Sequence, residues 1–125
     1  MPLRNGSVIV VDDDAAVRNA LKFALELEGL NVSAYDSGRQ LLDEPELPAK
    51  GCLVVDYYMP LMTGIQLVEV LRSRQVQLPV ILITGKVTED MRRKAIQAGI
   101  EEVLEKPLQD SSLMDSIRKA LGCAI

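Results

Sequence analysis

Four short runs of apolar residues indicate strands that are buried on both faces. A strand with one solvent-facing side alternates apolar and polar residues, whereas these runs show no alternation, which is typical of a parallel sheet covered by helices. A weaker fifth strand is expected at residues 31–35. The four runs are residues 8–11, 52–55, 79–83 and 103–104.

Segments with the apolar spacing of helices follow these strands. The first covers residues 17–27 and is followed by Gly29, a residue suited to the left-handed cap of a helix. The others cover residues 38–42, 65–71, 91–98 and 113–121.

The order of these segments predicts an α/β fold. Five strand–helix units with right-handed crossovers form an open parallel sheet with helices on both faces. Because the chain lacks a glycine-rich dinucleotide fingerprint, the pattern favours a flavodoxin-like doubly wound (βα)5 arrangement with strand order 2-1-3-4-5. With 125 residues, we expect one domain over residues 1–125.

The composition excludes several kinds of site. The chain has no histidine, so it contains no serine–histidine or cysteine–histidine catalytic pair, no histidine metal site and no imidazole pH switch. Its aromatic residues are one Phe and three Tyr, too few for a platform that stacks nucleic-acid bases.

Charge and cysteine usage favour a cytoplasmic protein without direct nucleic-acid or membrane contacts. The net charge is −4, whereas both kinds of partner require clustered positive charge. The apolar runs are too short to span a bilayer, and the first residues lack a signal region. Cys52 and Cys123 have no metal-ligand spacing, so we expect both to be reduced.

Chemically active side chains stand where the predicted strands end. Asp12, Asp13 and Asp14 follow the first strand, and Asp56 ends the third. The fourth ends in Thr84, and the fifth in Glu105-Lys106-Pro107. Because the carboxyl ends of parallel strands meet at one edge of the sheet, these groups should lie close together.

Each of these residues also has an ordinary structural interpretation. An Asp before a helix is commonly an N-cap, which is what we expect of Asp14. Asp56 alone could begin a turn, Thr84 could bind a backbone group, and Lys106 could be solvated. Clustered carboxylates, however, repel by roughly 3 kcal/mol per pair at about 5 Å and an effective dielectric constant near 20. A hard divalent cation such as Mg²⁺ would make the cluster tolerable.

Four motifs along the chain resemble the receiver domains of bacterial two-component response regulators. They are Val-Val-Asp-Asp-Asp at residues 10–14, Val-Asp-Tyr-Tyr-Met-Pro with Met-Thr-Gly over residues 55–64, Ile-Thr-Gly at 83–85 and Glu-Lys-Pro at 105–107. The resemblance covers essentially the whole chain. Within the CheY-like superfamily, the last two motifs are similar to those of the FixJ-like branch.

The resemblance implies a metal-dependent phosphoacceptor site. Asp56 would accept the phosphoryl group, and Asp12 and Asp13 would form the acidic pocket around Mg²⁺. Asp13, Asp56 and the backbone carbonyl of Tyr58 would ligate the ion directly. The family binds no other cofactor, and it accelerates only its own phosphorylation and dephosphorylation, so we expect no turnover enzyme.

The resemblance also implies a switch and a set of partners. Thr84 and Lys106 would bind the phosphoryl group, with a cis peptide bond between Lys106 and Pro107. The phosphoryl donor would be a sensor histidine kinase or a phosphotransfer protein, which supplies the histidine that this chain lacks. A homodimer would use the face formed by the fourth helix, fifth strand and fifth helix.

The chain departs from the family pattern at the switch. Val103 occupies a position where receivers usually carry Tyr or Phe, and Leu108 stands where Phe often follows Lys-Pro. A β-branched valine is stiff and buries less area than a ring, so we expect phosphorylation to alter the output face weakly or through a backbone shift. Tyr58 and Lys86 would screen the acyl phosphate from water and slow its decay.

Two other functions stay open at this stage. A degenerate receiver would act as a binding module that needs no phosphorylation. An aspartyl-phosphate phosphatase also uses an Asp nucleophile, although those enzymes carry Asp-x-Asp after the first strand. The basic residues at 92–94 and the acidic Glu101, Glu102 and Glu105 could belong to a partner face or be a solvated surface with local charge pairs.

Overall fold

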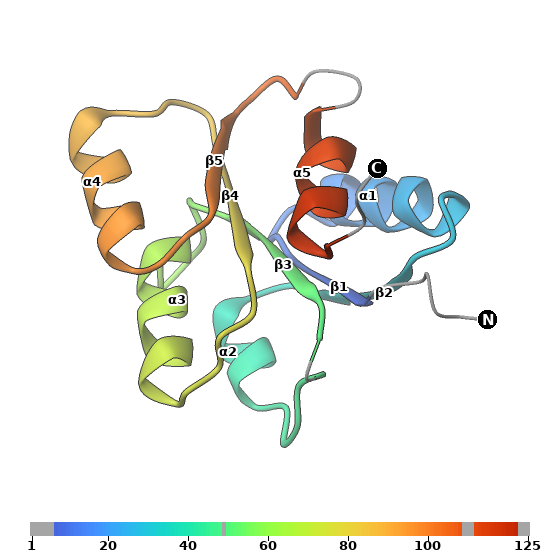
Figure 1. Ribbon diagram of the computed structural model, residues 1–125, viewed down its shortest axis with the longest axis horizontal. Helices are drawn as coiled ribbons and strands as arrows, with labels where there is room; N and C mark the ends of the chain where they lie inside the picture. The colour runs from blue at the N-terminus through green and yellow to red at the C-terminus, as the bar shows by residue number, and fades with distance from the viewer. Residues whose placement is uncertain (1–6, 49, 109–111, 123–125) are drawn as a thin grey trace.

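The computed structural model describes residues 7–48, 50–108 and 112–122 and contains one five-stranded parallel sheet (Figure 1). The strand order is β2-β1-β3-β4-β5, which confirms the order expected from the sequence. The strands are β1 (Ser7–Val11), β2 (Asn31–Tyr35), β3 (Cys52–Asp56), β4 (Val80–Thr84) and β5 (Glu102–Glu105).

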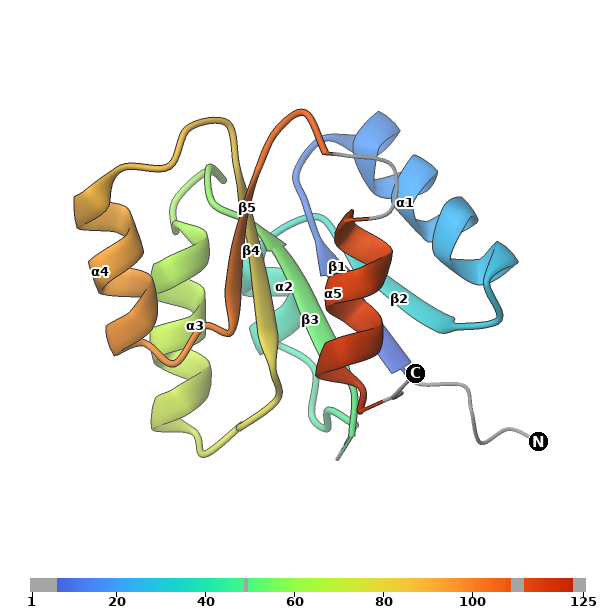
Figure 2. The same cartoon turned by 45° about the horizontal axis from the view of Figure 1, so that its top comes forward.

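Helices cover both faces of the sheet, so the doubly wound prediction is confirmed. Helices α2, α3 and α4 pack on one face, and α1 and α5 pack on the other (Figure 2). The helices are α1 (Ala15–Leu27), α2 (Gly38–Leu42), α3 (Gly64–Ser73), α4 (Glu89–Gln97) and α5 (Ser112–Ala120).

The three inner strands carry the core. All residues of β3 and β4 are buried, as are Val8 to Val11 of β1. Their side chains alternate between the two faces, so that Val80 and Leu82 join the cluster under α3 and α4 while Ile81 and Ile83 join the cluster under α1 and α5. This two-sided burial explains the unbroken apolar runs.

The prediction of burial on both faces was wrong for β5, the strand expected at residues 103–104. Val103 and Leu104 are only half-buried, because β5 is an edge strand with a neighbour on one side only. Each side chain still packs against one of the two core clusters. Edge strands commonly combine apolar and charged residues in this way.

The predicted capping residues of α1 are confirmed, although the helix begins at Ala15 rather than at Val17. Asp14 is the N-cap, and its carboxylate accepts hydrogen bonds from the backbone N–H groups of Ala16 and Val17 at 2.9 and 3.2 Å. Gly29 after the helix has a φ of 89°, the left-handed conformation that glycine adopts without steric cost.

Arg72 ties the C-terminal end of α4 to the segment after α3. Its guanidinium group donates hydrogen bonds to the carbonyls of Ala98 and Gly99 at 3.2 and 2.8 Å. It also donates to the carbonyls of Val76 and Leu78, both at 2.9 Å. Burial lowers the pKa of Arg72 from its ordinary value, although these partners keep its donors satisfied.

Cys52 is a free thiol in the centre of the sheet, and burial raises its pKa to about 12. Cys123 lies outside the described residues. Within the described ranges, none of the helices has the length and apolar character needed to cross a membrane.

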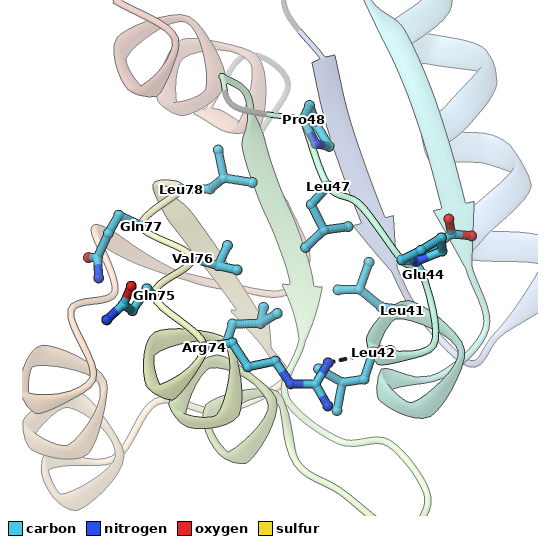
Figure 3. Close-up of a pocket in the computed structure, with 12 residues that line it drawn as sticks. Leu41, Leu42, Glu44, Leu47, Pro48, Arg74, Gln75, Val76, Gln77 and Leu78 are labelled. Carbon is cyan, nitrogen blue, oxygen red and sulfur yellow. Dashed lines mark hydrogen bonds between the residues drawn. The ribbon is translucent and has the colours of Figure 1, made fainter.

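A hollow of about 490 Å³ opens where the α2–β3 and α3–β4 segments meet (Figure 3). Leu41, Leu47 and Leu78 are among its lining residues, and Arg74 crosses its rim to donate a hydrogen bond to the Leu42 carbonyl at 2.9 Å. Its lining includes none of the predicted site residues.

Candidate functional site

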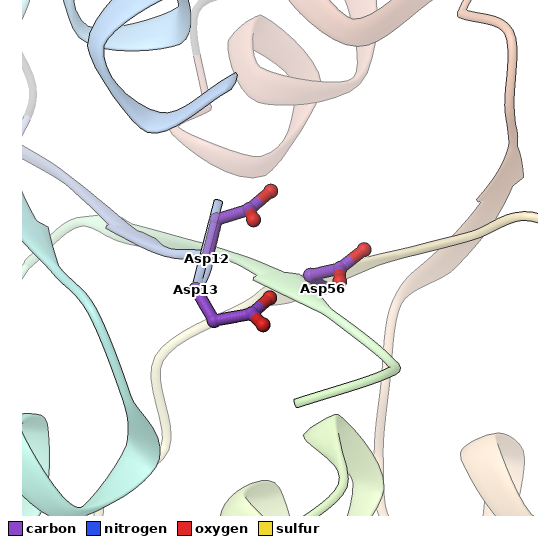
Figure 4. A group of neighbouring side chains, drawn as sticks. All are labelled: Asp12, Asp13 and Asp56. Atoms are coloured by element: carbon purple, nitrogen blue, oxygen red, sulfur yellow. The ribbon is translucent and has the colours of Figure 1, made fainter. Parts of the chain in front are cut away.

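The carboxylates of Asp12, Asp13 and Asp56 form one cluster, as Figure 4 shows. One oxygen from each side chain lies within 4.8 Å of the other two. The cluster follows from the sheet, because β1 and β3 are parallel neighbours with Val11 beside Val55. The strand ends therefore bring together acidic residues that are far apart in the sequence.

Asp12 lies in the turn between β1 and α1, and three polar groups hold it there. Its N–H donates to the Tyr35 carbonyl at 3.1 Å, and its carboxylate accepts a hydrogen bond from the Asp14 N–H at 2.9 Å. Its carbonyl accepts a hydrogen bond from the Arg18 guanidinium at 2.7 Å. Asp12 is buried, whereas Asp13 is exposed.

The N-terminus of α3 packs directly on the end of β3. The Gly64 N–H donates to the Tyr57 carbonyl at 2.9 Å. A Cβ atom at residue 64 would stand 2.7 Å from the Asp56 carbonyl oxygen and 2.8 Å from a methyl group of Leu82. Only glycine allows this approach, which fixes the backbone of the predicted phosphoacceptor.

Lys106, the residue directly after β5, contacts the cluster. Its Nζ lies 3.0 Å from Asp56 Oδ1. Burial would lower the pKa of Lys106, but the hydrogen bond and charge of Asp56, with the charges of Asp12 and Asp13, raise it overall. The peptide bond between Lys106 and Pro107 is cis, as the resemblance implied.

Burial raises the pKa values of both Asp12 and Asp56. For Asp56, the hydrogen bond from Lys106 opposes the effect of burial, and the charge of Asp12 adds to it. For Asp12, the hydrogen bond from the Asp14 N–H opposes burial. The two carboxylates are therefore harder to ionise than isolated ones, and a further positive charge would favour their ionised forms.

The donor set of the cluster fits Mg²⁺. Three carboxylates face the single ammonium group of Lys106, so the group carries excess negative charge at neutral pH. Mg²⁺ prefers oxygen ligands and binds to one or a few carboxylates while it keeps several waters. Tyr58 follows Asp56 by two positions, and the residue is 67% exposed. The role of its backbone carbonyl as a ligand stays a prediction.

Thr84 lies at the same sheet edge, but its hydroxyl contacts its own loop. The hydroxyl lies 3.3 Å from the Lys86 carbonyl and 3.4 Å from the Lys86 N–H, while the residue is fully buried. The alternation along β4 puts Thr84 on the face of α3 and α4, whereas the alternation along β3 puts Asp56 on the opposite face. Its predicted contact with a phosphoryl group thus requires a movement.

The two residues at which the chain departs from the family pattern lie on opposite faces of the sheet. Val103 is half-buried on the same face as α3 and α4, and Leu108 packs against the cluster under α1 and α5.

Of the basic residues on α4, Arg93 and Lys94 pair with Asp90 at 3.0 and 3.2 Å in exposed positions. Such pairs stabilise little, which supports the solvated-surface interpretation of these two residues.

Three contacts at the site were not predicted from the sequence. They are the hydrogen bond from Arg18 to Asp12, the close approach of Gly64 to Asp56, and a hydrogen bond from the Val87 N–H to Glu105 Oε2 at 3.1 Å. Gly64 directly follows Thr63, the N-cap of α3. Of the three contacts, only the approach of Gly64 to Asp56 had a signal in the sequence, namely a helix-capping residue followed by a glycine.

Comparisons with known proteins agree with this geometry. The family described as response regulator receiver domain matches residues 8–118. The transcriptional regulatory protein FixJ of Azorhizobium caulinodans is 36% identical over 115 residues, covering 92% of this chain and 54% of that protein. The C4-dicarboxylate transport transcriptional regulatory protein DctD of Pseudomonas aeruginosa is 39% identical over 114 residues, covering 91% of this chain and 25% of that protein.

The fold agrees equally well with a solved structure. The crystal structure of FixJ-N has a TM-score of 0.87 and 31% sequence identity, and the alignment covers 98% of each chain. By the sequence alignments, the chain spans about half the length of the Azorhizobium caulinodans FixJ protein and a quarter of the length of DctD.

Proposed function

Since the chain belongs to the response regulator receiver domain family of two-component systems, we propose that Asp56 accepts a phosphoryl group in a Mg²⁺-dependent reaction. The observation that carries this proposal is the combination of the three-carboxylate cluster with the Lys106 ammonium group, 3.0 Å from Asp56 Oδ1. A carboxylate surrounded by acidic groups and held by one lysine is suited to attack phosphorus once a metal ion neutralises the cluster.

In the proposed reaction, a carboxylate oxygen of Asp56 forms a bond to phosphorus while the bond from phosphorus to the donor's leaving group breaks. Lys106 lies where it can bind an oxygen of the transferring group and stabilise its negative charge. Asp12 and Asp13, with Asp56, would hold Mg²⁺, which when bound supplies positive charge to the phosphoryl oxygens. Lys106 would exchange its contact with Asp56 for one with the new acyl phosphate.

The chain would act as a switch rather than as a turnover enzyme. Each molecule has one acceptor, and the product is the modified protein itself. Decay of the acyl phosphate returns the chain to its starting state. We expect Tyr58 and Lys86 to slow this decay by limiting the access of water.

The proposed phosphoryl donor is a sensor histidine kinase or a phosphotransfer protein. The chain has no histidine, so the donor histidine would lie outside these 125 residues. We propose that this phosphoryl transfer takes place in the cytoplasm, in agreement with the free thiol of Cys52. The output would be a changed interaction surface on α4, β5 and α5, including a homodimer through this face.

The test is incubation with Mg²⁺ and acetyl phosphate, followed by intact-mass measurement. We expect one phosphoryl adduct on the wild type and none on Asp56→Asn. Omission of Mg²⁺ should abolish the adduct. A wild type that takes up no phosphoryl group would instead favour a binding module that works without phosphorylation.

A further inference from the structure

Two consecutive residues at the end of β5 contact opposite parts of the site. Lys106 binds Asp56 through its side chain, and its N–H donates to the Thr84 carbonyl at 2.8 Å. The Glu105 carboxylate extends to the other side, where Oε2 accepts a hydrogen bond from the Val87 N–H at 3.1 Å. The end of β5 thus joins the predicted phosphoacceptor to the β4–α4 loop, residues 85–88.

Two side chains hold this loop through neighbouring backbone amides. The Lys86 N–H lies 3.4 Å from the Thr84 hydroxyl, near the outer limit for a hydrogen bond. The Val87 N–H contact with Glu105 is shorter and has an ionised acceptor, which makes it the stronger of the two. Glu105 therefore contributes more than Thr84 to holding this loop in place.

Thr84, Val103 and Glu105 lie on the same face of the sheet. Thr84 pairs with Glu105 in the register of β4 and β5, and Leu82 pairs with Val103. The side chain of Val103 has no polar atom, so it cannot form a hydrogen bond with the loop. Among these three residues, Glu105 is the one that links β5 to the loop through a polar side chain.

We propose that Glu105 is a positioning residue that holds the β4–α4 loop in the conformation observed here and thereby limits the access of Thr84 to Asp56. This inference rests on the proposed phosphorylation of Asp56. In the resting state the Glu105–Val87 contact keeps the Thr84 hydroxyl beside Lys86. Loss of the contact frees the loop, so Thr84 reaches the phosphoryl group more often and phosphorylation is faster.

The experiment compares Glu105→Ala, Glu105→Gln and Glu102→Ala with the wild type. Glu105→Ala removes the acceptor, whereas Glu105→Gln removes the charge but keeps a carbonyl oxygen that can accept from Val87. Glu102→Ala removes the same charge from the other end of β5. For each protein we measure hydrogen exchange of the Val87 amide, the rate of phosphorylation by acetyl phosphate with Mg²⁺, and the melting temperature.

We expect Glu105→Ala to accelerate both Val87 exchange and phosphorylation about fivefold, the factor that corresponds to one ordinary hydrogen bond. Glu105→Gln should fall between the wild type and Glu105→Ala in both rates, because a neutral carbonyl oxygen accepts a weaker hydrogen bond than a carboxylate does. Glu102→Ala should match the wild type in both rates. All three variants should melt at temperatures similar to that of the wild type, because these side chains are on an edge strand.

Three results would overturn the proposal. If Glu105→Ala accelerates Val87 exchange but leaves phosphorylation unchanged, the contact is merely structural. If Glu105→Gln accelerates phosphorylation as much as Glu105→Ala, the effect is one of charge. If Val87 exchange does not change in Glu105→Ala, the contact does not hold the loop. A wild type without an Asp56 adduct would reject the proposed function itself, which separates that failure from the other three.

Discussion

The site has two sides that are built differently. On the acceptor side, at the ends of β1 and β3, Asp12 is held by three hydrogen bonds and α3 touches the Asp56 backbone through Gly64. On the loop side, at the ends of β4 and β5, the Thr84 hydroxyl has long contacts and Glu105 binds an exposed segment. The groups proposed to react are therefore fixed in advance, while the groups proposed to respond are weakly held.

Two glycines offer the sharpest test of this comparison. Gly64→Ala would press a Cβ atom against backbone and side chains near Asp56, so we expect a loss of about 1–3 kcal/mol in the free energy of unfolding, measured in urea. On the loop side, a Cβ atom at Gly85 meets nothing within 4 Å, so Gly85→Ala should cost less than about 0.5 kcal/mol. Equal effects would refute the difference in packing.

Mg²⁺ should stabilise the acceptor side specifically. We expect Mg²⁺ to bind the folded cluster and not the unfolded chain, so at ten times its dissociation constant it should raise the free energy of unfolding by about 1.4 kcal/mol. Asp13→Asn should reduce this gain, whereas Thr84→Val on the loop side should keep it. The comparison would fail if both variants responded to Mg²⁺ as the wild type does.

The acceptor side should also show a pH dependence without Mg²⁺. Burial raises the folded-state pKa of Asp12 above 3.8, so ionisation costs stability as the pH rises from 3.8 through the folded value. Asp12→Asn keeps an oxygen acceptor for the Asp14 N–H and removes the charge. We expect it to stabilise the protein at pH 7, because it removes a charge that burial disfavours. This advantage should disappear as the pH falls through that window, whereas an advantage independent of pH would contradict the prediction.

The smallest expected effect involves one residue from each side. Replacing Tyr58 and Lys86 together with alanine should shorten the lifetime of the phosphorylated protein severalfold, measured by the decay of the mass adduct. Both positions are exposed, so the double variant should unfold at the same urea concentration as the wild type. An unchanged lifetime would show that these side chains do not shield the acyl phosphate.

A related prediction concerns the output. Because Val103 has no ring to turn inward, phosphorylation should change the α4, β5 and α5 surface through backbone shifts in residues 85–88 rather than through a rotamer change. Side-chain and amide chemical shifts of the two states would distinguish these responses. Inward rotation at Val103, with the full rearrangement of an aromatic switch, would disprove the prediction.

The sequence was sufficient for the acceptor side because apolar runs and strand ends determine it. Once residues 8–11 and 52–55 are neighbouring parallel strands, Asp12 and Asp56 must meet at one edge. The loop side could not be predicted in the same way. The half-burial of Val103 depends on β5 being an edge strand, and the contact between Glu105 and Val87 depends on rotamers and loop conformation, which residue types alone do not determine.

Arg72, which donates four hydrogen bonds, holds one end of α4 more firmly than the other. Two of the four bind the carbonyls of Ala98 and Gly99 just beyond the C-terminal end of the helix, whereas its N-terminal end joins the weakly held β4–α4 loop. A helix of nine residues is about 13 Å long. A tilt of about 10° around the anchored end would therefore move the Thr88 end by roughly 2 Å while the end at Arg72 stays in place.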